Sequence, residues 1–254
     1  MNLAKYDQQI PLDRECRIIG YDQSTQVFAI EKASGVLTHP NSASTKQRTL
    51  LSAHYDMDEE KYSWKNDAGI NEFAYLVHRL DSPTSGIILV CLNQAISLQL
   101  KQAFAAQNVK KTYLAIVRQP SSFNNTVWRD KLYEVREKGN LRMRWGTKGK
   151  AAITEVSLAN LPVSTHRLAM LILKPRTGRT HQLRVQCAKR GMPIVGDRTY
   201  GDFSLNRKVE QKTKVSRLCL HACEISYELL LQGGKKKSYF FESPIPRSLG
   251  KLLK

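Results

Sequence analysis

The feature that most constrains the fold is a continuous apolar run, GIILVCL, at residues 86–92. An uncharged run of this length, bounded by turn residues, is typical of a strand that is buried on both faces. It therefore predicts a buried strand. Two earlier segments, at residues 16–22 and 26–32, are short apolar runs that end before the turn Ser34-Gly35, and they predict two more strands.

The rest of the chain also favours strands over helices. Polar, aperiodic stretches at residues 41–71 and 121–150 predict loops, the first with weak helical character. One helix is expected after the capping residue Asn93, and a second over residues 180–190, ended by Gly191. Further strands are expected at residues 74–80, 111–117, 152–161, 166–175, 217–227 and 238–243. With no repeat and no linker, the pattern predicts a single α+β domain over residues 1–254.

The charge of the chain points to a polyanionic partner. Lys and Arg total 40 against 22 Asp and Glu, which gives a formal net charge of +18. Such an excess costs self-repulsion, and a nucleic acid is the partner that most often offsets it. An acidic membrane surface would require a basic amphipathic helix or a lipidation signal, and the sequence contains neither.

Cysteine usage and hydropathy indicate the compartment. Five cysteines scattered over 254 residues do not predict a disulfide framework. The N-terminal segment lacks the apolar core of a signal peptide, and no apolar run is long enough to span a membrane. We therefore expect a soluble, cytoplasmic protein, and without a large apolar surface signal we expect a monomer.

Several familiar motifs are absent or fail on closer inspection. The chain has no glycine-rich dinucleotide fingerprint and no P-loop. Its HRLD segment, residues 78–81, matches the kinase catalytic loop in letters, but the glycine-rich loop and the Asp-Phe-Gly segment are missing. Cys219, His221 and Cys223 alternate along a predicted strand, whereas zinc ligands usually come from tight turns. We interpret these three as residues of a half-buried strand.

The sequence alone allows more than one role for two residues and one basic segment. Asp81, just ahead of the predicted buried strand, could be a surface ion-pair partner, a turn former or a reacting group. Tyr113 lies in a predicted strand, where packing is the ordinary role. The segment KPRTGRTHQLR, residues 174–184, contains four cations and no acid, and it begins a helix whose N–H groups also attract anions, which suits phosphate contact.

Five segments, in this order, resemble the RluA-type pseudouridine synthases: HRLDSPTSGIILV, KKTYLAIV, KPRTGRTHQLRV, GDRTYG and LCLHA. The resemblance begins at EKASGVLTHP and covers most of the chain. It implies a mixed, largely antiparallel central sheet with flanking helices and a central active-site cleft. It also implies no separate N-terminal RNA-binding domain, because the first strand of the resemblance already starts near residue 28.

The same resemblance implies roles for individual residues. Asp81 matches the family's essential aspartate, and Arg184 matches the basic residue that pairs with it. Tyr113 matches the tyrosine that packs on the target base, and Arg79 the arginine that enters the RNA stack. The remaining residues expected to contact the substrate are His78, Lys174, Arg179, Thr180 and His181, although for His78 a structural hydrogen bond is the default.

Two positions depart from the family pattern. Ala33 replaces a proline of the opening strand, and Gln186 replaces a histidine that often follows the QLRV segment. Both lie outside the residues assigned to chemistry, so they affect local packing or RNA contacts.

The resemblance implies a uridine isomerisation in ribosomal or transfer RNA, and the sequence does not choose between these RNAs. The reaction involves no redox change and no net hydrolysis, so we expect no cofactor and no metal. Asp81 could attack the anomeric carbon or the uracil ring, or assist elimination to a glycal. We expect Arg184 to keep Asp81 ionised, Tyr113 to take the proton from the ring carbon, and the target base to be flipped out.

Two other functions compete with this one. A non-catalytic RNA-binding or ribosome-assembly protein of the same fold would have lost the aspartate or the tyrosine, and both are present. A hydrolase that acts on nucleosides would release free uracil, whereas an isomerase releases no base.

Overall fold

The computed structural model describes residues 10–41, 47–137, 139–161, 164 and 166–254. The chain divides into two compact units, the first formed by Met1–Val109 and Glu224–Ser243, the second by Lys110–Cys223 and Pro244–Lys254. Strand β12 (Leu220–Leu230) contributes its first four residues to the second unit and the others to the first. The expectation of one catalytic domain over residues 1–254 stays a prediction.

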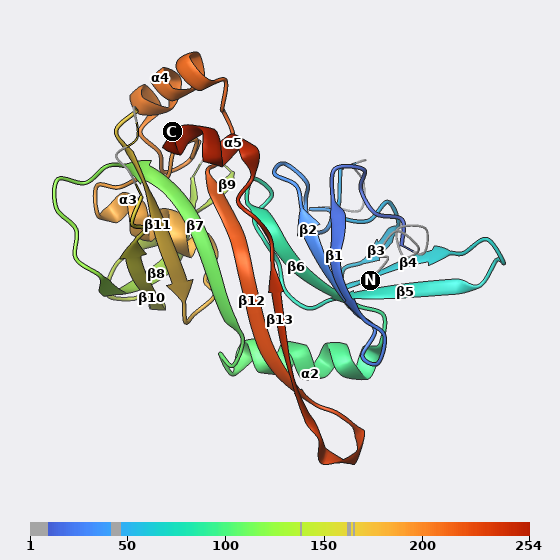
Figure 1. The fold of residues 1–254 in the computed structure, drawn as a ribbon. Coiled ribbons are helices and arrows are strands. Elements are labelled where there is room, and N and C mark those ends of the chain that lie inside the picture. The colour runs from blue at the N-terminus through green and yellow to red at the C-terminus, as the bar shows by residue number, and fades with distance from the viewer. Residues whose placement is uncertain (1–9, 42–46, 138, 162–163, 165) are drawn as a thin grey trace. The chain divides into compact units, whose positions relative to one another are not determined.

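The first unit is a sheet centred on the apolar run that the sequence singled out (Figure 1). This run forms β6 (Ser85–Cys91), in which every residue is buried. Strands follow the order β3-β4-β5-β6-β12; β2 also pairs with β6, β1 with β2, and β13 with β12. Their bounds are β1 (Arg17–Asp22), β2 (Val27–Lys32), β3 (His54–Asp56), β4 (Lys61–Lys65), β5 (Asn71–Leu76) and β13 (Lys236–Glu242). A short 3-10 turn, η1 (Gln232–Gly234), precedes β13.

One helix covers this sheet. Helix α2 (Gln94–Ala105) begins at Asn93, whose side chain accepts the N–H of Ile96 at 3.1 Å, as the sequence predicted. Its buried Leu100 joins Val27, Leu89 and other strand residues in one hydrophobic cluster. The helical spacing of apolar residues therefore fixes α2 on the sheet.

The second unit has its own sheet, in the order β12-β7-β11-β10-β8-β9. The strands are β7 (Lys110–Arg118), β8 (Thr126–Glu137), β9 (Asn140–Trp145), β10 (Lys150–Leu158) and β11 (Leu168–Pro175). Its helices are α3 (Gln182–Lys189), α4 (Phe203–Thr213), α5 (Arg247–Gly250) and the 3-10 helix η2 (Lys251–Leu253). Apolar residues of α3, α5, η2 and the strands form its core.

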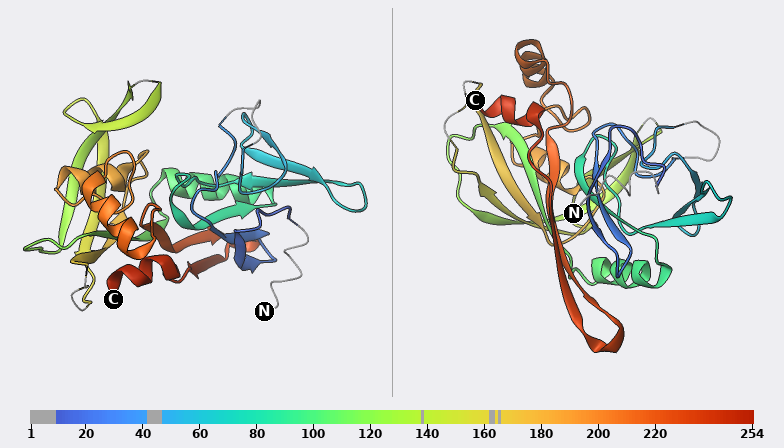
Figure 2. Two further views of the ribbon diagram at one scale, coloured as in Figure 1. Left: turned by 90° about the horizontal axis from the view of Figure 1, so that it is seen from above. Right: turned by 45° about the vertical axis from the view of Figure 1, so that its right-hand side comes forward.

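Two predicted loops are wrong. Residues 121–150 contain β8 and β9, which form a yellow-green hairpin arm in Figure 2. In β8 the three buried residues, Trp128, Asp130 and Leu132, alternate with exposed ones. Because Asp130 is charged, it interrupts the alternation of apolar residues that would have predicted a strand. Residues 41–71 likewise contain β3 and β4, in which Tyr55 and Tyr62 are the buried members of mostly polar strands.

Helix α4 was not predicted. It is capped by Asp202, whose side chain accepts the N–H of Leu205 at 2.9 Å. Val209 is its buried residue, so the sequence carries almost no apolar stripe to mark it.

The fold class is as expected. Among the described strands, every pairing with a described register is antiparallel, and an isolated bridge between Leu37 and Thr49 is parallel. With few helices, this is a mixed, largely antiparallel α+β fold. In the described part of the chain, no helix combines the length and the apolar character that crossing a membrane requires.

Candidate active site

Asp81 lies in the turn that connects β5 to β6 and is half-buried. On one side of it, the Thr38 hydroxyl donates to the carbonyl of Leu80 at 2.9 Å and accepts the Leu80 N–H at 3.2 Å. On the other side, the N–H of Thr84 donates to the carbonyl of Asp81 at 3.0 Å. The backbone that carries the carboxylate is therefore held on both sides.

Lys32, a fully buried residue at the end of β2, fixes the same turn. Its ammonium group donates to the carbonyls of Ala33 (2.9 Å), Val36 (2.7 Å) and Ser82 (3.0 Å). A buried charge is costly unless it is hydrogen-bonded, and these three acceptors offset that cost. Lys32 therefore ties the end of β2 to the residue that follows Asp81, a role that the sequence did not predict.

The departure at Ala33 has a local structural consequence. The N–H of Ala33 donates to the sulfur of Cys16 at 3.4 Å. A proline has no N–H and could not form this contact. The carbonyl that Lys32 binds would be present with either residue, so the substitution leaves the turn at Asp81 intact.

His78 and Arg79 have different surroundings. Nε2 of His78 accepts the N–H of Leu89 at 3.0 Å, and its ring stacks on Phe104 at 4.6 Å between centroids. The structural hydrogen bond expected of His78 is thus present. Arg79 is exposed, with Nη1 3.2 Å from Nε2 of His39.

In the second unit, Tyr113 lies on β7 opposite Leu173 of β11 and packs against the core. Two residues earlier, Nζ of Lys111 lies 3.9 Å from the point that a Cβ atom on Gly178 would occupy. Burial lowers the pKa of Lys111. Lys111 therefore brings a partly desolvated amine to the loop before α3, which the sequence did not single out.

Arg184 is buried on α3 and forms a two-point ion pair with Asp197. Its Nε and Nη2 donate to the two carboxylate oxygens at 2.8 and 2.9 Å. Burial acts to raise the pKa of Asp197, but the hydrogen bonds and charge of Arg184, together with the N–H groups of Tyr200 and Thr199, outweigh it and lower the pKa. Asp197 therefore stays ionised, and it was missed because nothing in the sequence pairs it with α3.

Tyr200 adds a second contact to Arg184. The guanidinium carbon of Arg184 lies 5.2 Å from the centroid of the Tyr200 ring. The Tyr200 hydroxyl accepts the N–H of Met143 at 2.8 Å and lies 2.9 Å from Nδ1 of His181. His181 has a left-handed backbone, with a φ of 52°, at the first turn of α3. These bonds join β9, the start of α3 and the GDRTYG loop.

The predicted RNA-contact residues of this unit lie at two places. Arg179, Thr180 and His181 precede α3, and Lys174 lies near the end of β11. Arg179 is exposed, and its Nε donates to the carbonyl of Ala151 at 3.1 Å. Thr180 and Lys174 are exposed as well. The structure thus brings the first three to the helix that carries Arg184, and whether they contact RNA stays a prediction.

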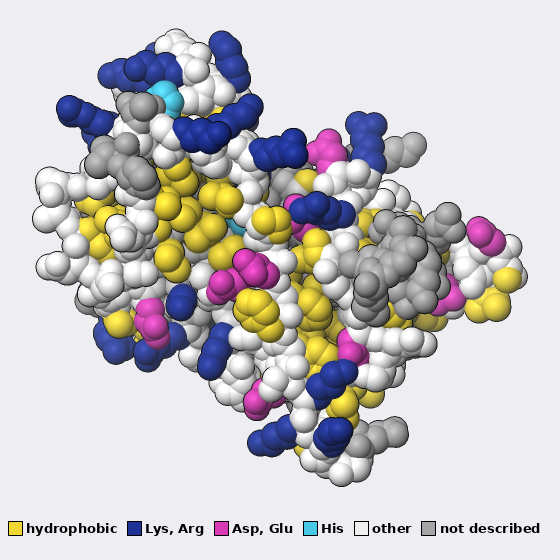
Figure 3. Space-filling view, viewed as in Figure 1, with side chains coloured by type: hydrophobic (Ala, Val, Ile, Leu, Met, Phe, Trp, Pro, Cys, Tyr) yellow, Lys and Arg dark blue, Asp and Glu magenta, His cyan; other side chains and the backbone are white. Residues whose placement is uncertain are grey.

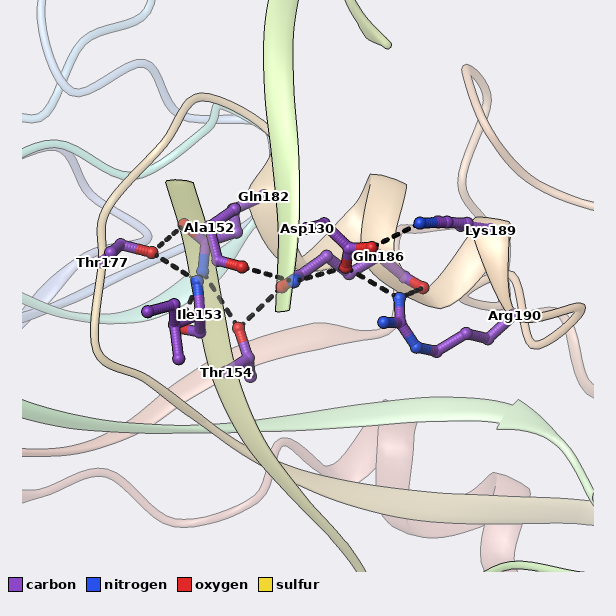
Figure 4. A network of polar contacts seen from close by, with 9 residues as sticks. All are labelled: Asp130, Ala152, Ile153, Thr154, Thr177, Gln182, Gln186, Lys189 and Arg190. Carbon is purple, nitrogen blue, oxygen red and sulfur yellow. Dashed lines mark hydrogen bonds and ion pairs between the residues drawn. The ribbon is translucent and has the colours of Figure 1, made fainter. Parts of the chain in front are cut away.

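Gln186, the second departure from the family pattern, is the centre of a buried polar network (Figure 4). Its side chain accepts the hydroxyl of Thr154 at 2.7 Å and donates to Asp130 at 2.8 Å. Asp130 also accepts Lys189 (2.6 Å) and Arg190 (2.9 Å). Burial would raise the pKa of Asp130, but these hydrogen bonds outweigh it and lower the pKa. The network fastens α3, and with it Arg184, to β8 and β10.

Cys219, His221 and Cys223 are core residues. All three are buried, and Cys219 belongs to the hydrophobic cluster of the second unit. Leu220 and Ala222 are buried too, so this strand is covered on both faces rather than half-buried. Burial raises the pKa of Cys219 to about 12. Within the described residues, no three His, Cys, Asp or Glu side chains gather as metal ligands.

The surface of the second unit is strongly basic around α4, where blue side chains gather in Figure 3. The exposed cations of this helix and its end are Arg207, Lys208, Lys212 and Lys214. This patch lies outside residues 136–150 and 174–190, the two basic segments whose Lys and Arg residues are expected to contact RNA.

Known proteins resemble this chain in sequence over the segments that carry these residues. The family model of RNA pseudouridylate synthase matches residues 26–189, a range that includes Asp81, Tyr113 and Arg184. The tRNA pseudouridine synthase C of Yersinia pestis is 33% identical over 211 residues, which cover 80% of this chain and 78% of that protein. The ribosomal large subunit pseudouridine synthase D of Borreliella burgdorferi is 31% identical over 227 residues, 89% of this chain and 64% of that one.

Solved structures match over nearly the whole chain. Human RNA Pseudouridylate Synthase Domain Containing 4 aligns with a TM-score of 0.63 at 20% identity, covering 93% of this chain and 91% of that one. Human RNA Pseudouridylate Synthase Domain Containing 1 aligns with a TM-score of 0.62 at 22% identity, covering 92% and 86%. At these identities, the structures bear on the fold alone.

Proposed function

The chain belongs to the RNA pseudouridylate synthase family and is an RNA pseudouridine synthase, an isomerase; on that premise we propose that Asp81 is its nucleophile. The observation that carries this proposal is the turn around Asp81, which Lys32 and Thr38 hold in place at the start of a fully buried strand. A carboxylate that reacts repeatedly must keep one position relative to its substrate, because misplacement by about 1 Å can cost 100-fold in rate.

The reaction requires few other groups from the protein. The bond between the uracil nitrogen and the ribose breaks, the base turns, and a ring carbon joins the same ribose carbon. That ring carbon loses a proton, and the nitrogen that left the ribose gains one. Atoms and electrons balance within the nucleotide, so neither a redox cofactor nor water as a reactant is required. Asp81 supplies a covalent or an eliminating step, on the ribose or on the ring.

Arg184 keeps Asp81 ionised in this scheme. Its ion pair with Asp197 fixes the guanidinium of Arg184 at Nε and Nη2, and the planar fork of a guanidinium matches the geometry of a carboxylate. With Asp197 fixing its plane and Tyr200 its face, Arg184 is preorganised and needs little rearrangement to bind another anion.

Tyr113 and Arg79 act on the base in this scheme. Tyr113 packs on the flipped uracil and accepts the proton that leaves the ring carbon. Arg79, exposed beside His39, enters the RNA stack at the position that the uridine vacates. Unstacking a base costs a few kcal/mol, and the inserted arginine with its phosphate contacts offsets part of that cost.

The substrate is a uridine in structured RNA. The relatives named above act, by their names, on transfer RNA or on the large ribosomal RNA, and we propose one of these two classes for this chain. We further propose that the protein works in the cytoplasm as a monomer without a cofactor. Arg179, Thr180 and His181 would contact the phosphates, since polar groups at a helix start suit anions, and Lys174 near the end of β11 would add a cation.

Product analysis tests this function. Transfer and ribosomal RNA from cells lacking the protein are incubated with it, digested to nucleosides and separated by chromatography. We expect a new pseudouridine peak and no free base. Free uracil would instead indicate a hydrolase, and unchanged nucleosides despite RNA binding would favour the non-catalytic RNA-binding alternative.

A further inference from the structure

A cavity of about 400 Å³ lies in the second unit, beside the β8–β9 hairpin. Its volume falls within the range of small-molecule sites, about 300–1,000 Å³. Among the described residues, Tyr113 and Arg184 do not line it. The residues that line it are Tyr133, Glu137, Arg142, Met143, Arg144, Trp145 and Tyr200.

The lining combines aromatic faces with a polar edge. Trp145 is 49% exposed, so its ring is accessible to a ligand. Tyr133 and Tyr200 add two more rings. The carboxylate of Glu137 lies 3.5 Å from Arg142 and 2.5 Å from Arg144, so donors and an acceptor are held together at the edge.

The cavity is tied to the helix of Arg184. Tyr200 lines it and at the same time packs its ring on the Arg184 guanidinium. Met143, another lining residue, donates its N–H to the Tyr200 hydroxyl at 2.8 Å. Only the side chain of Tyr200 would therefore separate a ligand in the cavity from Arg184, a proposed catalytic residue.

We propose that this cavity binds an unpaired nucleobase of the RNA substrate, a base other than the uridine that reacts. The proposal rests on the proposed function, because it takes RNA as the partner. Proteins that read RNA stack unpaired bases on aromatic side chains and bind base edges with polar groups. The segment at residues 136–150 contains six basic residues and one acidic residue, which suits the adjoining phosphates.

The test compares two RNA probes of equal length and charge, a hairpin with a single-stranded loop and a fully paired duplex. Affinities are measured by fluorescence anisotropy for the wild type, Trp145→Ala and Trp145→Phe. We expect Trp145→Ala to weaken hairpin binding about fivefold or more, to leave duplex binding unchanged, and Trp145→Phe to restore binding. Phe240→Ala, which removes a 61% exposed ring of β13 outside the cavity, is the matched control and should change neither affinity.

Unchanged hairpin affinity in Trp145→Ala, or equal loss for both probes, would overturn the proposal. A second measurement uses the unmodified protein, so it does not depend on a variant that folds. The hairpin carries 4-thiouridine in its loop and is crosslinked by light, and crosslinks at Tyr133, Trp145 or Tyr200 support the cavity, whereas crosslinks only elsewhere contradict it. Pseudouridine formation in transfer and ribosomal RNA, assayed in parallel, reports separately on the proposed function.

Discussion

Asp197 is the residue on which the position of Arg184 most directly depends. Both groups are buried, and the guanidinium is satisfied at two points by this carboxylate. Removing one partner of a buried ion pair leaves an uncompensated charge, which typically costs about 3–5 kcal/mol. The resemblance that singles out Arg184 gives no reason for the orientation of its side chain, and Asp197 supplies one.

We expect Asp197→Asn to lower the free energy of unfolding by about 3–5 kcal/mol near pH 7. The folded-state pKa of Asp197 is lowered, so its contribution is fully present above the ordinary value of about 3.9 and is lost as the pH falls through the folded value. Urea unfolding of both proteins at several pH values measures this. The difference should be constant from about pH 7 down to about pH 4 and shrink as the pH falls further, and a difference that persists unchanged to about pH 2 would contradict the assignment.

Lys32 offers a second test at this scale. Lys32→Met keeps an unbranched side chain and removes the donor to three carbonyls. One of these carbonyls belongs to Ser82, the residue after Asp81. Hydrogen bonds from charged groups contribute about 1.5–3 kcal/mol, so we expect a loss of at least about 2 kcal/mol in stability and a lower kcat as the turn relaxes. Lys65→Met, on an exposed position of β4, is the control and should change stability by less than about 0.5 kcal/mol.

At the scale of elements, the GDRTYG loop places Asp197 and Tyr200 against α3. Gly196 has a φ of 77°, and a Cβ atom there would lie 1.9 Å from the carbonyl oxygen of Arg217. Gly191 has a similar φ of 69°, yet a Cβ atom there would meet nothing within 4 Å. Alanine substitutions at Gly191 and Gly196 therefore separate the energetic cost of backbone strain from that of a steric clash.

Gly191→Ala should therefore cost only about 1–2 kcal/mol, the price of a left-handed conformation without a glycine. Gly196→Ala should cost more than about 3 kcal/mol, because the loop must also move away from Arg217. Thermal or urea unfolding of the two variants measures the difference. Equal destabilisation would show that the loop adapts, and that its position relative to α3 is not fixed by this contact.

Elements with a clear apolar period were predictable, and those with polar interruptions were not. Residues 86–92 predicted the buried strand β6, and Asn93 predicted the start of α2. Strand β8 was missed because its buried Asp130 is neutralised by Lys189 and Arg190, which lie some sixty residues away in sequence. A partner that distant leaves no local signal. Asp81, Tyr113 and Arg184 were assigned by resemblance. Lys32 and Asp197 were missed because their roles depend on hydrogen bonds to other segments of the chain, which no local pattern reveals.

At the scale of the whole molecule, the net charge of +18 should control RNA affinity. Replacing the exposed Lys150, Lys174 and Arg179 by Gln removes up to three phosphate contacts. Each lost contact reduces the slope of log affinity against log salt by about 0.7 for single-stranded RNA, so the slope should fall by about 2. Lys65 and Lys235, exposed cations outside both basic segments, serve as controls. An unchanged slope in the triple variant would place the RNA elsewhere, with the α4 patch as the next candidate.

The central claim is that Asp81 performs the isomerisation, and tritium release from RNA tests it most directly. RNA whose uridines carry tritium on the ring carbon that joins the ribose loses the label when pseudouridine forms. The wild type should release label in proportion to the modified sites, and Asp81→Asn should release none above background while keeping its far-ultraviolet circular dichroism and its RNA affinity. Release by Asp81→Asn at the wild-type rate would exclude Asp81 from the chemistry.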